Sequence, residues 1–423
     1  MTKRRQRAGL LVAAAVSAAM LTGTAGVVAQ DQVEFDVYDL HTANPGLAFV
    51  RMAADAFQGT HPNVKINITT LENEALKDKI AADMQAGNPP DMFQSWGGGL
   101  LRQQVEAGMV QDITSQTADV ADSLSGGALS LYQVDGKQYG IPYNFGLVGL
   151  WYNKDLLAQA GIDAPATTWE DFLTQVQTLK DAGITPISLG GGDQWPSMFW
   201  WAYLALRIAG GDALGQAVNT GDWNQEAFVK AGTELARLVA LEPFQAGADA
   251  ATHDEQQGTF GNGKAAYMLQ GQWTVGSQRA QSESKAGIPN IGWAPFPAVD
   301  GGAGAATDAF GGGDGFSIGR DAPAEAVEFA KYLVSPDVAS VWQSFNDGTL
   351  LPTVGAEQYI TDPALRDVVT QRNAATFAQL YLDQATPTNY GTAINEAVAG
   401  LVAGALTPEQ VTQAMTDAAA AAS

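Results

Sequence analysis

The stretch GKQYGIPYNFGLVGLWYNKDLLAQAGI, residues 136–162, indicates how the chain is organised. Residues 139–143 are predicted to form a short strand. Pro142 places that strand at a sheet edge or ends it, because proline has no N–H to donate. A second, apolar strand is predicted over 147–152, and a helix over 154–159. The order strand, kink, strand, helix leaves polar and aromatic side chains at the kink, where they can face a cleft.

The kink carries Tyr143, Asn144 and Phe145, which are candidate ligand contacts. Around them, Gly-Ile-Pro is followed after a short interval by Tyr-Asn-Lys-Asp-Leu-Leu and a glycine. This pattern resembles the hinge region of the extracellular solute-binding proteins of ABC sugar importers. The resemblance implies that the chain first crosses here between two lobes. Asn144 departs from the pattern, since that region often carries an acid in the family.

Length and composition limit the classes of protein that need considering. The 423 residues are too many for one core, which predicts two domains, and 46% hydrophobic with 16% charged residues is typical of a soluble globular chain. The absence of cysteine and the presence of only three histidines exclude thiolate and His-rich metal sites, so no metal and no cofactor are expected. The net charge of −23 predicts repulsion of nucleic acid and of anionic lipid.

Residues 1–29 differ in kind from the rest. Four basic residues within the first seven precede an Ala/Val/Leu/Gly-rich run that ends in Val-Val-Ala at Ala29, which predicts a signal peptide and a mature chain from Gln30. Secretion to the periplasm or the cell surface is therefore expected. A membrane anchor is the alternative, because the run has roughly the ~20 residues of a span. Thr24 stands where a lipoprotein of the family would carry cysteine. Cleavage would leave 22 − 4 = 18 basic residues against 45 acidic ones, a net charge of −27.

After the leader, strands are predicted over 33–40 and 64–69, each followed by a helix, which indicates a parallel sheet covered by helices. Ligands of such sheets bind beyond the carboxyl ends of the strands. That rule points to Asn44 and to the loop Trp96-Gly97-Gly98-Gly99 after a predicted strand over 91–94. Glycines there allow close backbone approach to a ligand, and Gly97 is a candidate contact. The resemblance implies a sugar contact for Trp96, whereas a buried core tryptophan is the alternative.

Two further tryptophans stand at predicted element ends. Trp195 follows a glycine-rich loop after a strand predicted over 184–189 and precedes a helix predicted over 198–209. Trp273 ends FGNGKAAYMLQGQW, which also contains the candidate Gln270 and is the second string that matches the sugar-binding family. The resemblance implies that Trp273 lies on a sugar ring. A core position at a helix start is the alternative.

Seven glycines in residues 301–315 predict a loop before a strand over 316–318. Gly312 and Asp314 lie in it, and the resemblance implies a second crossing between lobes at this point. Asp314 can either bond a sugar hydroxyl or form a turn. Tyr390 stands ahead of a helix predicted over 393–403, where the family often places another contact.

The resemblance covers nearly all of the mature chain and implies an α/β, two-lobed periplasmic-binding-protein fold of type II-like architecture. Each lobe is expected to be a mixed or parallel sheet flanked by helices. The N-terminal lobe is predicted over 30–145 plus 313–358, and the C-terminal lobe over 146–312 plus 359–423.

The implied function is the substrate-binding component of an ABC transporter, a monomer that captures an oligosaccharide by aromatic stacking and delivers it to membrane permease subunits. Xylo-oligosaccharide is the favoured ligand. A secreted glycoside hydrolase is the alternative and requires two carboxylates about 5–10 Å apart, whereas Asp314 is the one acid in the strongest loop motifs. A binding protein for a polyamine, peptide or metal is a third possibility; acidic residues among the aromatics would favour a polyamine, and His or Tyr clusters would favour a metal.

Overall fold

A computed structural model describes residues 32–422, and the predicted leader lies outside them. The chain opens with β1 (Val33–Asp39), α1 (Gly46–Thr60), β2 (Val64–Thr70), α2 (Asn73–Gln85) and β3 (Met92–Ser95). β1 pairs in parallel with β2, from Val33 opposite Val64 to Asp39 opposite Thr70, and pairs in parallel with β3 on its other side. The predicted strand and helix alternation is therefore confirmed, and so is the α/β class.

The large sheet has six strands in the order β11-β10-β3-β1-β2, with β6 beside β10. β6 (Gly140–Leu147) and β3 run antiparallel to β10 (Ala309–Ile318), whereas β11 (Ala378–Leu380) runs parallel to it, so the sheet is mixed. Pro142 does not end β6. The strand continues because β6 pairs only with β10, so the missing N–H of Pro142 breaks no second ladder, and the register shifts nearby, between Asp314 and Gly315.

The glycine run 311–313 lies within β10 and not in a loop, which corrects the sequence prediction. A Cβ at Gly311 would lie 2.3 Å from the carbonyl oxygen of Gly146, and one at Gly313 would lie 2.5 Å from that of Asn144. The glycines therefore let β6 approach β10 closely.

The small sheet is antiparallel, in the order β8-β7-β9, and consists of β7 (Gly149–Asn153), β8 (Tyr267–Gln270) and β9 (Ile291–Ala294). The strand predicted over 184–189 is reduced to isolated bridges from Ile187 to Phe244 and Tyr267. Pro186 lacks the N–H that a longer ladder would need.

The other elements follow in chain order. They are α3 (Gly98–Glu106), α4 (Thr114–Thr117), η1 (Ala121–Ser123), α5 (Gly126–Ser130), β4 (Gln133–Val134), β5 (Lys137–Gln138), α6 (Lys154–Gln159), α7 (Trp169–Asp181), η2 (Gly191–Asp193), α8 (Trp195–Ala209), α9 (Gly211–Thr220), α10 (Glu226–Val239), α11 (His253–Gly261), α12 (Thr274–Gln281), α13 (Ala324–Leu333), α14 (Pro336–Ser344), η3 (Ala356–Tyr359), α15 (Pro363–Ala374), α16 (Leu382–Ala385), α17 (Thr388–Val402) and α18 (Pro408–Ala422).

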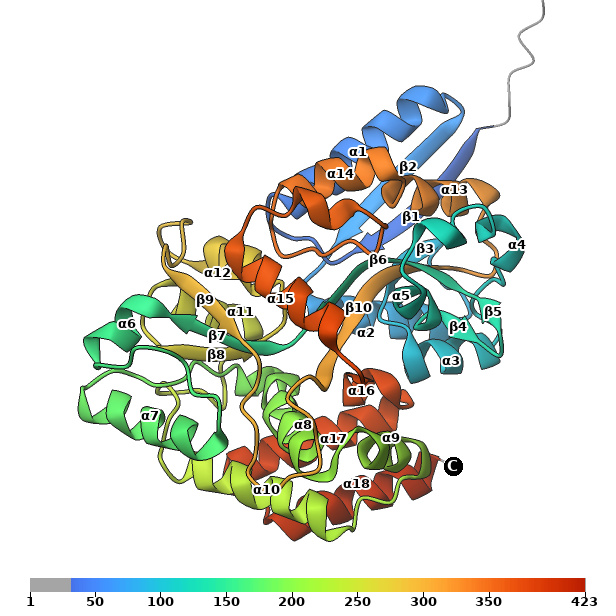
Figure 1. The fold of residues 1–423 in the computed structure, drawn as a ribbon. Coiled ribbons are helices and arrows are strands. Elements are labelled where there is room, and N and C mark those ends of the chain that lie inside the picture. Colours follow the sequence, from blue (N-terminus) through green and yellow to red (C-terminus); the bar gives the residue numbers. More distant parts are fainter. Residues whose placement is uncertain (1–31, 423) are drawn as a thin grey trace, which may run out of the picture.

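Two bodies are visible in Figure 1: a first lobe with the large sheet, α1, α13 and α14, and a second lobe with the small sheet and most of the later helices. Each has its own buried cluster. Phe35, Phe329 and Trp342 belong to the cluster of the first lobe, whereas Trp200 and Ile394 belong to the largest cluster of the second. β6 and β10 run between the two bodies (Figure 1), so the chain crosses where β6 leads to β7 and where β9 leads to β10.

Candidate functional site

Three adjoining cavities of about 560, 170 and 160 Å³ lie between the two lobes. The smallest shares Trp273 and His253 with the 170 Å³ cavity, and it shares Trp96 and Lys77 with the 560 Å³ cavity. Because the cavities share walls in this way, they form one elongated groove, which is called the cleft below. Its walls come from α2, α3 and the loops after β1 and β3 in the first lobe, and from the starts of α8, α11 and α12 together with α16 and α17 in the second.

Aromatic rings form a continuous wall in the middle of the cleft. The rings of Trp195 and Trp273 meet edge to face, with centroids 6.2 Å apart, and Trp273 meets Tyr381 in the same way at 6.2 Å. Trp195 and Trp96 are largely buried, whereas Trp273 is partly exposed and lines both smaller cavities. Trp195 is the first residue of α8, which begins three residues earlier than the sequence predicts, and Trp273 immediately precedes α12. Helix starts therefore present these rings to the cleft.

Gln270 fixes the ring of Trp273 from behind. Its Oε1 accepts a 3.1 Å hydrogen bond from Nε1 of Trp273, and its Nε2 donates to Oε1 of Gln256 at 2.9 Å. Gln270 is fully buried and lines none of the three cavities. Its place in the structure is that of a positioning residue and not of a direct contact.

Asp314 and Asn144 join the two crossing strands at one end of the cleft. Nδ2 of Asn144 donates to Asp314 at 2.8 Å, and Nε2 of Gln94 donates to the other carboxylate oxygen at 3.1 Å. Tyr143 donates from its hydroxyl to Gln94 at 2.8 Å. Burial raises the pKa of Asp314 against the opposing effect of these amide donors and of His41. Asp314, Asn144 and Tyr143 all line the 170 Å³ cavity, although Tyr143 lies mainly in the core of the first lobe.

Asn144 also accepts hydrogen bonds from two other segments, one in each lobe. Its Oδ1 accepts from the backbone N–H of Leu350 at 2.8 Å and from Nε2 of Gln272 at 3.1 Å. An amide can donate to one partner and accept from others, which a carboxylate in this position could not do. The departure from the family pattern at this position therefore serves a local network.

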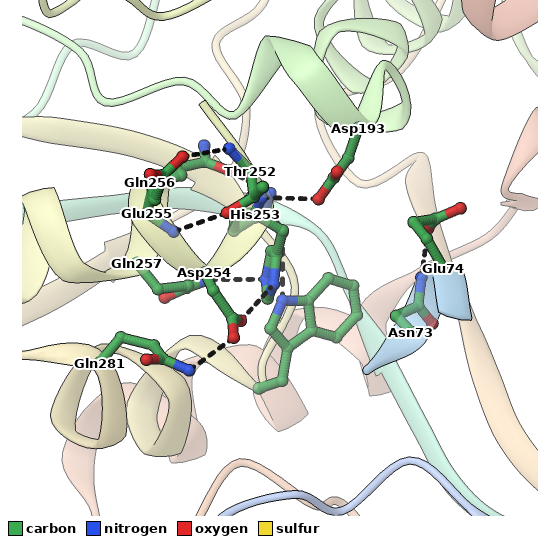
Figure 2. A network of polar contacts seen from close by, with 12 residues as sticks. Asn73, Glu74, Asp193, Thr252, His253, Asp254, Glu255, Gln256, Gln257 and Gln281 are labelled. Carbon is green, nitrogen blue, oxygen red and sulfur yellow. Dashed lines mark hydrogen bonds and ion pairs between the residues drawn. The ribbon is translucent and has the colours of Figure 1, made fainter. Parts of the chain in front are cut away.

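A second polar network surrounds His253 at the start of α11, and the sequence reading missed it (Figure 2). The backbone N–H of His253 donates to Asp193 at 2.7 Å, and its ring lies beside Trp195 with centroids 5.1 Å apart. Asp254 accepts from Nε2 of Gln281 at 2.7 Å. Thr252 and Glu255 form a capping box at this helix start, and the Thr-x-x-Glu spacing was the signal that could have located it.

Residues of the first lobe face this network across the cleft. Asn73 and Glu74 of α2 lie apart from the His253 network in Figure 2, and both Glu74 and Asp193 line the 560 Å³ cavity. Burial and the neighbouring charge of Asp254 raise the pKa of Glu72, which precedes α2. Burial acts to raise the pKa of Asp254 as well, yet the hydrogen bond and charge of His253 lower it. The carboxyl groups of Glu72 in the first lobe and Asp254 in the second therefore influence each other's pKa.

Asn44 is exposed and lines the 170 Å³ cavity. Besides Gln270, four predicted contacts lie outside the cleft wall, namely Tyr390, Phe145, Gly97 and Gly312. Tyr390 is buried in α17, which begins at Thr388 and not at 393, and its hydroxyl accepts from Nε1 of Trp223. Phe145 faces Arg372, whose guanidinium lies 5.9 Å from the ring centroid.

Gly97 and Gly312 are packing positions instead of ligand contacts. A Cβ at Gly97 would lie 2.3 Å from the carbonyl oxygen of Leu131, and one at Gly312 would lie 2.6 Å from the ring of Tyr381. Neither glycine lines the three cavities. Gly312 does permit Tyr381 to sit where it does, and Tyr381 lines the cleft.

Within residues 32–422, no group of three or more His, Asp or Glu side chains is arranged to hold a metal ion. Over the same residues, no helix combines the length and the apolar character that a membrane crossing requires.

Comparison with known proteins agrees with this architecture. Residues 41–340 match the bacterial extracellular solute-binding protein family. An uncharacterized ABC transporter extracellular-binding protein of Pyrococcus horikoshii is 25% identical over 68% of this chain and 67% of its own length, so the match spans about two thirds of that relative.

Two solved structures cover almost the whole described chain. One, from work on xylan utilization by the thermophilic bacterium Caldanaerobius polysaccharolyticus, has a TM-score of 0.85 and 28% identity over 91% of this chain and 99% of its own. A chitin oligosaccharide binding protein has a TM-score of 0.84 and 24% identity over 93% and 99%, which shows the shared two-lobed fold. The second structure is named as a binding protein and the matching family is one of solute-binding proteins, so the glycoside hydrolase alternative gains no support. The chain belongs to the bacterial extracellular solute-binding protein family.

Proposed function

We propose that this solute-binding protein captures an oligosaccharide in the cleft and delivers it to the membrane permease subunits of an ABC importer, with a xylo-oligosaccharide as the favoured ligand. One observation carries the proposal: Trp273, Trp195, Trp96 and Tyr381 line a single elongated groove between the lobes. Sugar rings have apolar faces that stack on flat aromatic side chains. Their hydroxyl rims require the amide and carboxylate partners that flank these rings.

Within the family, the motifs Ser-Trp-Gly-Gly-Gly (95–99) and Pro-Tyr-Asn-Phe-Gly (142–146) most resemble those of binders of xylo-oligosaccharides or similar plant-derived sugars. This resemblance and the similarity to the structure from the xylan-utilization work support the preference for xylo-oligosaccharide. The elongated groove suits a chain of several sugar units better than a single sugar. The motifs at 95–99 and 142–146 and the aromatic wall fit neutral sugars in general. Chito-oligosaccharide is therefore tested beside xylo-oligosaccharide.

The division into lobes of residues 30–145 plus 313–358 and 146–312 plus 359–423 belongs to the same proposal. Its support is the separation of the buried clusters and the crossings at β6 to β7 and β9 to β10. The division also requires a third crossing between residues 358 and 359, and it assigns β11 of the large sheet to the second lobe. Rotation of the lobes about these crossings would open and close the cleft around the ligand. The 3.1 Å hydrogen bond that Gln272 of the second lobe donates to Asn144 of the first is a contact that such a rotation would strain.

We place the mature protein outside the cytoplasmic membrane, in the periplasm or at the cell surface, as a monomer after removal of residues 1–29. The support is the leader sequence and the extracellular family. The net charge of −23 should repel nucleic acid, so no nucleic acid partner is expected.

Calorimetric titration of the mature protein with xylo-, malto-, cello- and chito-oligosaccharides tests the proposal. Tryptophan fluorescence is followed in parallel, and the sugar is recovered and analysed afterwards. Saturable binding of one sugar class, with xylo-oligosaccharide tightest and the sugar recovered intact, is the expected result. Cleaved sugar would replace the proposal with the hydrolase, and no response to any sugar would refute the ligand class.

A further inference from the structure

The walls of the cleft carry a strong excess of carboxylates. Glu72, Glu74, Asp314 and Asp347 line it from the first lobe, and Asp193, Asp254 and Asp383 line it from the second. Lys77 is the one lysine among the lining residues, and no arginine is among them. The remaining groups that could carry positive charge are His41 and His253, and each lies beside an aspartate.

Few of these carboxylates are neutralised by a positive side chain. Nζ of Lys77 lies 3.0 Å from Glu74, which uses the one lysine charge. Asp254 lies 3.3 Å from Nδ1 of His253, which carries a positive charge only when it is protonated. Asp383 and Asp314 are held by neutral donors: Asp383 by Nδ2 of Asn395 at 3.1 Å, and Asp314 by two amides. A neutral donor stabilises a carboxylate without cancelling its charge, so the cleft keeps a negative potential.

Two buried amide oxygens in the same wall have no partner. Oε1 of Gln384 and Oδ1 of Asn395 form no hydrogen bond within the described residues, and their residues are 6% and 9% exposed. Both side chains line the 560 Å³ cavity, beside Asp383. An unpaired buried acceptor is costly, and a ligand that donates hydrogen bonds would satisfy it. Charge and hydrogen-bonding capacity therefore point to the same kind of ligand, one rich in donors.

We propose that the cleft discriminates by charge: it accepts neutral oligosaccharides and rejects those that carry a carboxylate, such as uronic-acid-substituted chains. This inference rests on the proposed sugar-binding function. A hydroxyl group can donate to the lining carboxylates and to the free oxygens of Gln384 and Asn395. A sugar carboxylate offers only acceptors there, and it brings a like charge into a partly desolvated groove, where charge repulsion is weakly screened.

The test compares three ligands of one backbone: linear xylotetraose, xylotetraose with one glucuronic acid branch, and the same branched sugar with its carboxyl reduced to an alcohol. Calorimetry at low salt should show at least about tenfold weaker binding for the acid than for the reduced branch, a difference of about 1.4 kcal/mol. The gap should shrink as salt is raised, because screening weakens repulsion between charges. The reduced branch controls for size.

The double variant Glu74→Gln with Asp193→Asn should reduce the difference in affinity between the acid branch and the reduced branch. It removes two lining charges while keeping acceptor oxygens. Asp163→Asn with Glu226→Gln removes two exposed charges that do not line the cleft, and should leave the gap unchanged. If the acid binds as tightly as the reduced branch or more tightly, and linear xylotetraose still binds, the charge inference is overturned and the sugar proposal stands. Failure of all three ligands overturns the sugar proposal and this inference with it. If the double variant does not fold, the salt dependence of the unaltered protein still decides the matter.

Discussion

The tryptophans of α8 and those of the cleft are the same residue type in opposite roles. Trp200 and Trp201 in α8 are 0% exposed and pack among other aromatic rings of the second lobe. Trp195, on the first turn of the same helix, and Trp273, just before α12, line the cleft instead. The difference teaches that place within an element decides the role, because a helix start projects into the space between lobes and a helix middle packs against a neighbour.

The largest expected effect is on the core side of this comparison. Trp201→Ala should lower the free energy of unfolding by about 3–5 kcal/mol, because it leaves a large cavity beside Trp223 and Phe228. Denaturant titration measures this. A loss below about 1 kcal/mol would mean that Trp201 does not belong to the close-packed core.

Trp273→Ala should affect binding more than stability. It should weaken sugar binding by about 100-fold, as truncation of a central aromatic anchor does. Its effect on unfolding should stay smaller than that of Trp201→Ala, because the ring is partly exposed. Calorimetry and denaturant titration on the same samples separate the two. Trp273→Phe keeps a flat ring and serves as the control, with affinity between those of Ala and Trp. Unchanged affinity in Trp273→Ala would contradict the assignment of the cleft.

Gln270→Met sharpens the comparison by altering the support of the ring instead of the ring itself. Loss of the 3.1 Å bond leaves Nε1 of Trp273 without its partner and the ring freer to move. Binding should weaken by about tenfold or less, in keeping with the roughly 1 kcal/mol of a single hydrogen bond. The tryptophan fluorescence of the free protein should change with it. An effect as large as that of Trp273→Ala would show that Gln270 acts directly on the ligand.

The smallest expected effect is on the pH dependence of stability, and it arises from Glu72 in the cleft. The pKa of Glu72 lies above its usual 4.5 in the folded protein, so the folded state holds this proton more tightly than the unfolded state. Stability should therefore fall as pH rises through the window above 4.5 and should be regained on acidification. Glu72→Gln should flatten this part of the profile, and thermal melts from pH 4 to 7 test it. Solvent screening keeps the effect small at an exposed side chain. A profile that Glu72→Gln leaves unaltered would show that the carboxylates of the two lobes do not interact.

Much of the architecture was readable from local sequence. The alternation in 33–40 and 64–69 predicted β1 and β2, and the apolar spacing between them predicted α1, because periodicity and turn residues act within a few neighbours along the chain. The strings around Asn144 and Trp273 indicated the family, which the comparison confirmed. Glycine runs misled the reading at 311–313, since a glycine in a strand and a glycine in a loop look alike without the neighbouring strand.

The sequence by itself determined the class of fold, the family and the tryptophans that stand at element ends. Only the tertiary structure decided which side chains meet. Tyr390 turns into the helical core because α17 starts earlier and packs on Trp223, and Phe145 turns away toward Arg372. His253 reaches Trp195 through the packing of α11 against η2 and α8. These outcomes depend on contacts between residues far apart in the chain, whose relative placement no local pattern encodes.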